Sequence, residues 1–352
     1  MTVTDVVVEA PEASKPKRRS RISGKALYIT GTVALLGYLV AGPLGVLVFS
    51  SFKRTEGTLP FEAESPYTLE NYSDVFLSSS TFSTLWNTAI YAAGALTLSF
   101  TIAITLAWLV ERTDIAFRNT IYTMVIASLG IPAVISGISW GLLGSERIGV
   151  VNVFLRWAFH LDGIVGPFNV FSFPGMILVQ SLTMVPVTFL LISGAFRAME
   201  ASLEEAALIS GASFRQTLGK ISLPVLAPAL FSAVVYQLVT VIESLDIPLI
   251  IGFRGNILVL STRVYLEVQP IGGLPNYGMA STFSILMLFV AVGPLLYYNR
   301  LISRSDRFST VTGKSYHQKR YELGSAKPFV TIAVFGYLFL ALLLPILILV
   351  WT

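Results

Sequence analysis

The stretch Glu205-Ala206-Ala207-Leu208-Ile209-Ser210-Gly211, followed after nine residues by Ile221-Ser222-Leu223-Pro224, lies in a short polar segment between long apolar runs. Its pattern predicts two small helices joined at a glycine. Ser202 and Glu205 have the spacing of a capping box, which satisfies the free amides at a helix start. Gly211 can adopt the left-handed conformation that ends a helix.

The second small helix has its own start and stop signals. Ser213 and Gln216 repeat the capping-box spacing. Pro224 lacks an amide donor, so we expect the second helix to end there. The segment as a whole therefore predicts a helix–glycine–helix elbow.

The composition of the chain places this elbow next to a membrane. Hydrophobic residues make up 54% of the sequence, charged residues 12%, and the mean hydropathy is +0.73. The charges are gathered between charge-free windows that each exceed the roughly 20 residues needed to cross a bilayer as a helix. Backbone groups in lipid must be paired within the segment, and the alternating pattern of a barrel is absent. The fold class is therefore an all-α, polytopic helical membrane protein.

The charge-free windows predict seven spans. Pro132 lies inside the third and can kink it. The apolar, glycine-broken segment 145–172 is expected to hold a helix at the membrane interface. The expected spans are 26–51, 85–110, 120–143, 173–195, 225–251, 277–301 and one beginning at residue 328.

Lysine and arginine predict the orientation of these spans. With the N-terminus in the cytoplasm, 18 of the 24 Lys and Arg residues fall on the cytoplasmic side. The helix–glycine–helix elbow then also lies in the cytoplasm. The basic cluster 15–21 next to the first span is expected to contact anionic lipid rather than nucleic acid.

The elbow resembles the EAA loop of ABC importer permeases, because every specified position of that pattern (EAA, three residues, Gly, nine residues, I-x-LP) is matched. In that family the loop docks on a cytoplasmic ATPase subunit dimer and transmits its motion, so ATP hydrolysis belongs to the partner and the permease is no enzyme. The resemblance implies a type I transmembrane domain at 84–302, with its coupling loop at 198–224. The implied ATPase-coupling residues are Glu204, Glu205, Ala206, Ala207, Gly211, Ile221, Leu223 and Pro224.

A second resemblance concerns the run 243–252, its continuation to Thr262 and the segment 311–316, which look like the ferric-iron permease subfamily. That subfamily joins two permease halves in one chain and is fed by a periplasmic substrate-binding protein. The resemblance implies import of ferric iron across the bacterial inner membrane by alternating access. Relatives in the group are assigned to polyamines, thiamine or phosphonates, and these stay open as alternatives.

The same subfamily explains the domain organisation that the sequence predicts. Residues 1–25 are polar and basic and are expected to be a disordered cytoplasmic tail. The core of six spans is followed by a cytoplasmic linker at 303–327 and by the first span of a second half at 328–352. The ends of the first and last spans, 43–50 and 345–352, align without gaps. We therefore expect the chain to be the N-terminal part of a fused, two-half permease.

Three polar residues inside the spans are candidates for the transport pathway. Glu243 and Asp246 have i, i+3 spacing, so we expect them on one face of the fifth helix. Carboxylates at membrane depth face a polar cavity or a basic partner. Their hard oxygen atoms would suit Fe(III), but pairing with Arg254 or Arg263, or a structural cap at the interface, is the favoured interpretation. Gln180 in the fourth span could line the pathway, although packing is its favoured role.

Other chemistries find little support in the sequence. The chain has no cysteine and two histidines, and His160 and His317 make poor metal sites, so neither a metal site nor a cofactor is expected. Thr312-Gly313-Lys314-Ser315 resembles the end of a P-loop, but Phe308 stands where its first glycine is required. A membrane-embedded enzyme is disfavoured because no acid–base pair is evident. An ion-gradient-driven secondary transporter is the alternative of another class, and it would need no ATPase.

Overall fold

The computed structural model describes residues 24–199, 202–302 and 320–351. Residues 1–23 of the expected disordered tail and most of the expected linker, with His317, lie outside the described residues, while Gly24 and Lys25 begin helix α1. Those residues form helices, turns and three isolated bridges but no strand, so the all-α prediction is confirmed. The chain divides into two compact units, residues 1–46 and residues 47–352. The first unit contains most of helix α1 (Gly24–Ser51), and everything below concerns the second.

Most of the predicted spans are present as single helices. The second, fourth and sixth correspond to α3 (Ser79–Arg112), α7 (Phe173–Ala198) and α12 (Tyr277–Ile302). The last is formed by α13 (Lys327–Leu338), a π-helical turn and α14 (Leu344–Trp351). Within the described residues, six helices are long and apolar enough to cross a membrane, or up to eight if each of two bent pairs is one span.

The third predicted span is one of the bent pairs. It consists of α4 (Arg118–Ala127) and α5 (Ala133–Leu143), whose axes differ by 96°. Pro132 directly precedes α5 in an extended conformation, with ψ of 140°. Proline cannot donate the helical hydrogen bond and disfavours a helical residue before it. The expected kink is therefore a full break. The short helix α6 (Val150–Phe159) follows within the segment 145–172.

The fifth predicted span is shorter than expected. Helix α10 (Leu223–Glu243) ends eight residues early, because Ser244 is extended and Pro248 could not donate to the carbonyl of Ser244. Glu243 and Asp246 are therefore not on one helix face, which corrects the prediction. The chain continues through a π-helical turn (Pro248–Gly252) and a 3₁₀ turn (Phe253–Gly255) to α11 (Leu260–Val268). The axis of α11 lies at 92° to the axis of the two preceding turns.

Pro224 does not end the second small helix, contrary to expectation. Helix α9 (Phe214–Thr217) runs through a π-helical turn (Leu218–Ser222) directly into α10. Pro224 occupies the first turn of α10, where its fixed φ fits the helix and fewer amide donors are needed. The result is one continuous helical path from Phe214 to Glu243.

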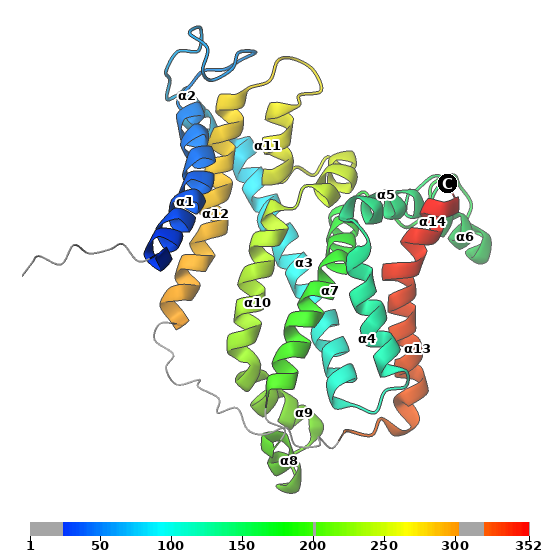
Figure 1. Cartoon of the computed structure of the whole chain (residues 1–352). Helices are drawn as coiled ribbons and strands as arrows, with labels where there is room; N and C mark the ends of the chain where they lie inside the picture. Colours follow the sequence, from blue (N-terminus) through cyan, green and yellow to red (C-terminus); the bar gives the residue numbers. More distant parts are fainter. Residues whose placement is uncertain (1–23, 200–201, 303–319, 352) are drawn as a thin grey trace, which may run out of the picture. The chain divides into compact units, whose positions relative to one another are not determined.

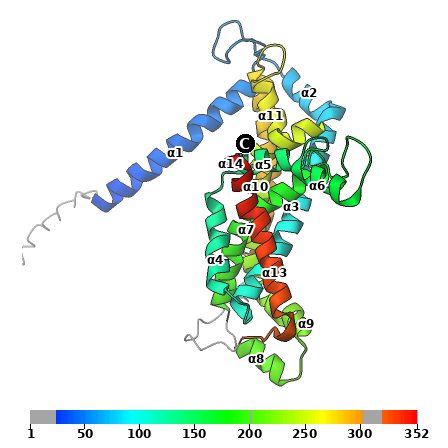
Figure 2. The ribbon, with the colours of Figure 1, turned by 90° about the vertical axis from the view of Figure 1, so that its right-hand side faces the viewer.

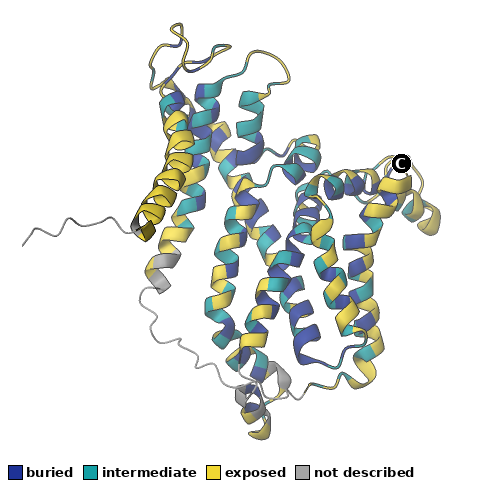
Figure 3. Cartoon of the chain, in the orientation of Figure 1, coloured by how far each residue is buried: buried dark blue, intermediate teal, exposed yellow. Residues whose placement is uncertain are grey.

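The core lies mainly between α3 and α7. Small residues on α3 repeat every three to four positions and are buried, which lets the two helices approach closely. These residues are Ala92, Ala95, Ser99, Ala103 and Ala107. The burial map shows a dark band along α3 and α7 (Figure 3). On the other side, Val334 and Leu338 of α13 join the hydrophobic cluster that contains Ile121 of α4.

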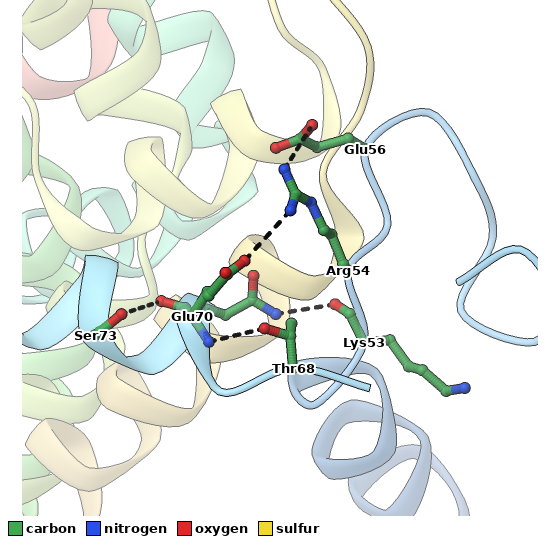
Figure 4. A network of polar contacts seen from close by, with 7 residues as sticks. Lys53, Arg54, Glu56, Thr68, Glu70 and Ser73 are labelled. Atoms are coloured by element: carbon green, nitrogen blue, oxygen red, sulfur yellow. Dashed lines mark hydrogen bonds and ion pairs between the residues drawn. The ribbon is translucent and has the colours of Figure 1, made fainter. Parts of the chain in front are cut away.

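The segment between α1 and α2 (Glu70–Leu77) is held by polar contacts (Figure 4). Arg54 lies 3.5 Å from a carboxylate oxygen of Glu70 and 3.9 Å from Glu56. The Lys53 side chain points away from this group and donates to the carbonyl of Ser65 at 3.0 Å. These contacts order a segment that is otherwise without regular structure.

Candidate coupling site and membrane cavity

The elbow predicted from the sequence is formed by α8 (Ser202–Ile209), Gly211 and α9, at one end of the helix bundle (Figure 1 and Figure 2). Gly211 has φ of +81°. The amide of Ala212 donates to the carbonyl of Ala207 at 3.0 Å, which is the closing hydrogen bond of a Schellman motif. The predicted left-handed glycine at the end of the first helix is therefore confirmed.

The predicted capping box at the start of the second small helix is partly formed. The amide of Ser213 donates to Oε1 of Gln216 at 2.9 Å, which is one half of a capping box. The side chains of Ser202 and Glu205 lie outside the described residues, so the first capping box and the role of Glu205 stay predictions.

Glu204 is buried against the end of α3. Its carboxylate lies 2.9 Å from Nε of Arg112, and the two side chains are 7% and 2% exposed. The same carboxylate accepts a 2.6 Å hydrogen bond from the hydroxyl of Ser222. Arg112 also donates to the carbonyl of Phe196 at 2.7 Å and so satisfies a free acceptor in the last turn of α7. One buried ion pair thus joins α8 to α3, α7 and the π-helical turn.

A second set of contacts ties the same end of α3 to the segment before α13. The amide of Tyr321 donates to the carbonyl of Arg112 at 2.9 Å. The carboxylate of Asp114 accepts from the amide of Leu323 and from Nζ of Lys327, both at 2.9 Å. The Leu323 amide and the Lys327 ammonium hold the pKa of Asp114 below its usual range. The turn between α3 and α4 is therefore a junction between α8 and the segment 320–327.

The expected coupling residues differ in how much surface they offer. Ala206, Gly211 and Pro224 are exposed, and Ile221 and Leu223 are partly so. Ala207 and Glu204 are buried and face the chain's own helices. The sequence analysis missed Ile209, a large apolar side chain that is 88% exposed on α8. A single exposed isoleucine is common on protein surfaces, so a docking role for Ile209 rests on its position in the elbow beside the exposed Ala206.

The three candidate pathway residues line one cavity of about 530 Å³. Gln180 comes from α7, Glu243 from the end of α10, and Asp246 from the turn that follows. Trp140 of α5 lies on the wall, and Tyr236 and Thr240 extend along α10. Although the helix ends at Glu243, Glu243 and Asp246 still line the same cavity.

The two carboxylates at this cavity do not have the expected arginine partners. Arg263 is paired with Glu267 at 3.0 Å, and Arg254 lies over the ring of Phe171, 5.3 Å from its centroid. Glu243 and Asp246 form no ion pair within the described part of the chain. Of the favoured interpretation, pairing with one of these arginines is not found, and a structural cap at the interface stays a prediction.

Two glutamines form the buried polar wall of the cavity. Gln180 accepts hydrogen bonds from Tyr91 at 2.8 Å and Ser244 at 3.1 Å. Gln237 donates to the carbonyl of Met184 at 3.1 Å and to Thr188 at 2.6 Å. Gln180 is therefore buried on the cavity wall, and a role in the transport pathway stays a prediction.

The family model for the inner membrane component of binding-protein-dependent transport systems matches residues 99–307, more than half of the chain. The chain belongs to this family. The match contains the α8–Gly211–α9 elbow and every described residue that lines the cavity except Ala341.

Similar proteins include permeases for different substrates. A putative ferric transport system permease protein of Haemophilus influenzae is 28% identical over 235 residues, which are 66% of this chain and 36% of that protein. The chain spans about a third of the length of the two ferric permeases that it matches. A trehalose/maltose transport system permease protein of Thermococcus litoralis is 25% identical over 282 residues, 75% of this chain and 92% of that protein.

The fold is also that of a solved transporter. A chain in the crystal structure of a bacterial alginate ABC transporter, in complex with its alginate pentasaccharide-bound periplasmic protein, superposes with a TM-score of 0.61. The match covers 82% of this chain and 96% of that chain, at 20% sequence identity. The prediction of an ABC permease fold is thereby confirmed.

Proposed function

We propose that this inner membrane component is the permease of an ABC importer and is driven by a separate cytoplasmic ATPase dimer. The observation that carries the proposal is the elbow formed by α8, Gly211 and α9, which leaves Ala206 and Ile209 exposed and leads without a break into α10. A force applied to the elbow would reach the cavity through that helix. The chain itself is then no ATPase.

The other proposed partners follow from the family. A periplasmic substrate-binding protein delivers the substrate on the outer side, and a second permease half, fused or separate, completes the pathway. The solved alginate transporter contains a periplasmic protein of this kind. The proposed orientation has the N-terminus and the elbow in the cytoplasm, supported by the distribution of Lys and Arg.

For the substrate we propose ferric iron. The support is the resemblance of residues 243–262 and 311–316 to ferric permeases and the matching relatives of that type. Trehalose/maltose permeases match as well, so the family does not decide the substrate. Polyamines, thiamine and phosphonates are the alternatives within the same machinery.

The proposed function is tested with the chain, its second half and its ATPase in proteoliposomes. We expect uptake of ferric iron delivered by the periplasmic protein to require ATP and to continue when ionophores collapse all ion gradients. Copurification should recover an ATPase with the chain. Uptake that follows an ion gradient without ATP would instead identify a secondary transporter and refute the proposal.

A further inference from the structure

We infer that residues 320–327 form a strap that carries movement of the elbow to α13, by a route separate from α10. The strap is the segment that leads into α13, and Tyr321 is the residue at which it meets the ion pair that anchors α8. The inference rests on the proposed function for the force that moves the elbow. It adds a second mechanical connection between the elbow and the cavity.

Arg112 is held on two sides by different parts of the chain. Its side chain pairs with Glu204 of α8 at 2.9 Å, while its carbonyl accepts a 2.9 Å hydrogen bond from the amide of Tyr321. That carbonyl belongs to the last residue of α3, where no helical donor follows. The elbow and the strap therefore share one residue, and a shift of Arg112 acts on both.

The side chain of Tyr321 adds a contact with the same ion pair. Its backbone carbonyl accepts from the amide of Asp114 at 3.1 Å, and its ring centroid lies 6.4 Å from that of Trp108. Burial raises the pKa of its phenol, and the negative charge of Glu204 raises that pKa further, while Arg112 lowers it. Such charge interactions weaken with distance. The phenol therefore lies close to the ion pair that holds α8.

The polar contacts that hold the strap are partly exposed, so the strap is able to open. Beside Tyr321, the carboxylate of Asp114 attaches it by accepting from the amide of Leu323 and from Nζ of Lys327. The side chains of Asp114 and Lys327 are 32% and 39% exposed, and exposed pairs contribute little to stability. Local opening of such a segment costs far less than unfolding the bundle. The strap is therefore an element with two states, docked and released.

The strap continues into a helix that reaches the cavity. Helix α13 starts at the same end of the bundle as α8 and α9 (Figure 1 and Figure 2). Phe335 of α13 packs edge to face on Phe117 at the start of α4, with ring centroids 6.1 Å apart. The π-helical turn after α13 contains Ala341, which lines the cavity, and Ser139 of α5 donates to the carbonyl of Pro345 in α14 at 2.9 Å. A shift of the strap would therefore reach the cavity wall through α13.

The chain has no cysteine, so one introduced thiol can report whether the strap is docked. Leu323 is partly buried against the hydrophobic cluster of α3, α4 and α7. A thiol in Leu323→Cys should therefore react slowly with a maleimide while the strap is docked and rapidly once it is released. We would measure this rate in the full chain assembled with its second half, in nanodiscs and without nucleotide. The reporter control is Glu322→Cys, one residue away and exposed, which should react rapidly in every variant.

Two variants test the connection from its two ends. In Leu323→Cys, adding Glu204→Gln should raise the maleimide rate about tenfold, because release of α8 frees the residue on which the strap is docked. Adding Glu70→Gln, which removes an exposed carboxylate elsewhere, should leave the rate unchanged. Coupling is reciprocal, so Asp114→Ala, which removes the contacts with the Leu323 amide and Lys327, should accelerate amide exchange in residues 202–209 about fivefold. A strap that is only a structural tie would not change this exchange.

Each arm of the experiment decides by itself. An unchanged maleimide rate in Glu204→Gln would overturn the inference, and so would unchanged exchange of residues 202–209 in Asp114→Ala. Elution of each variant as an assembled complex shows that it is folded, and because the arms use different variants, one that fails to assemble leaves the other decisive. No ATP is present, so a failure of ATP-driven uptake would refute the proposed function without changing what these measurements say of the strap.

Discussion

The ion pair between Arg112 and Glu204 gives the sharpest test of how the elbow is held. Glu204→Gln keeps the shape of the side chain and its contact with Ser222, but leaves the Arg112 guanidinium buried without its counter-charge. Removing one partner of a buried pair costs about 3–5 kcal/mol. At about 1.4 kcal/mol per tenfold change in equilibrium, α8 would be detached from the end of α3 at least a hundred times more often.

The detachment has two measurable consequences. Amide hydrogen exchange in residues 202–209 should accelerate by a similar factor, while exchange within α7 and α10 should change little. ATP hydrolysis stimulated by the periplasmic binding protein should fall towards its basal rate, because movement of the ATPase would no longer reach α3 and α7 through α8.

An exposed ion pair provides the control. Arg54 lies 3.5 Å from the carboxylate of Glu70, both side chains are more than half exposed, and α8 is not involved. Exposed pairs contribute at most about 1 kcal/mol, so Glu70→Gln should leave exchange in α8 unchanged. In a double-mutant cycle, Arg112→Met combined with Glu204→Met should be less destabilising than the sum of the two single changes. If Glu204→Gln shows the amide exchange in residues 202–209 and the stimulated ATP hydrolysis of the wild type, the reasoning is refuted.

Three further predictions concern the same end of the molecule. Gly211→Val forces a β-branched residue to φ of +81° and should cost about 1–3 kcal/mol locally, so that transport is uncoupled while the assembled complex still purifies. The control is Gly219→Ala, because Gly219 has open space around it and no positive φ. Normal transport by Gly211→Val would contradict the docking role. Ile209→Asp should lower affinity for the ATPase about tenfold or more with an unchanged melting temperature, because the side chain is exposed; unchanged copurification would exclude it from the interface. The contact of Asp114 with residues 323–327 should be complete above the ordinary carboxyl pKa of about 3.9. It should be lost as the pH falls through the lower pKa that Asp114 has in the folded protein. Amide exchange at Leu323 should therefore accelerate at low pH, and Asp114→Asn should abolish this pH dependence.

The sequence predicts the membrane spans well because their evidence is local. Each is a long charge-free run, and a run of that length in lipid can only be a helix. Gly211 is equally local, since one residue without a Cβ decides where α8 ends. The prolines show the limit of this approach. Pro132 breaks its span and Pro224 continues one, because the outcome depends on whether the preceding residue can leave or keep the helical conformation.

The features that carry the mechanism were hidden because they join distant parts of the chain. Arg112 and Glu204 are far apart in sequence and belong to different helices, so nothing in either neighbourhood indicates a pair. The bent segment around α11 was missed because it is short and contains Arg263 and Glu267, whose charges cancel only once the helix places them 3.0 Å apart. Gln237 reads as an isolated polar residue until its contacts with α7 are known.

The unexpected continuity of α9, the π-helical turn and α10 connects the two functional regions. Because Pro224 does not interrupt this path, the elbow at Gly211 and the cavity at Glu243 lie at opposite ends of one helical element. A π-helical turn is a weak point at which such an element can tighten to regular α-helix, rotating everything beyond it. Ser222 lies in that turn and is bonded to Glu204, so the ion pair that anchors α8 also holds the turn. Release of Glu204 would then alter the direction in which Tyr236, Thr240 and Glu243 face the cavity.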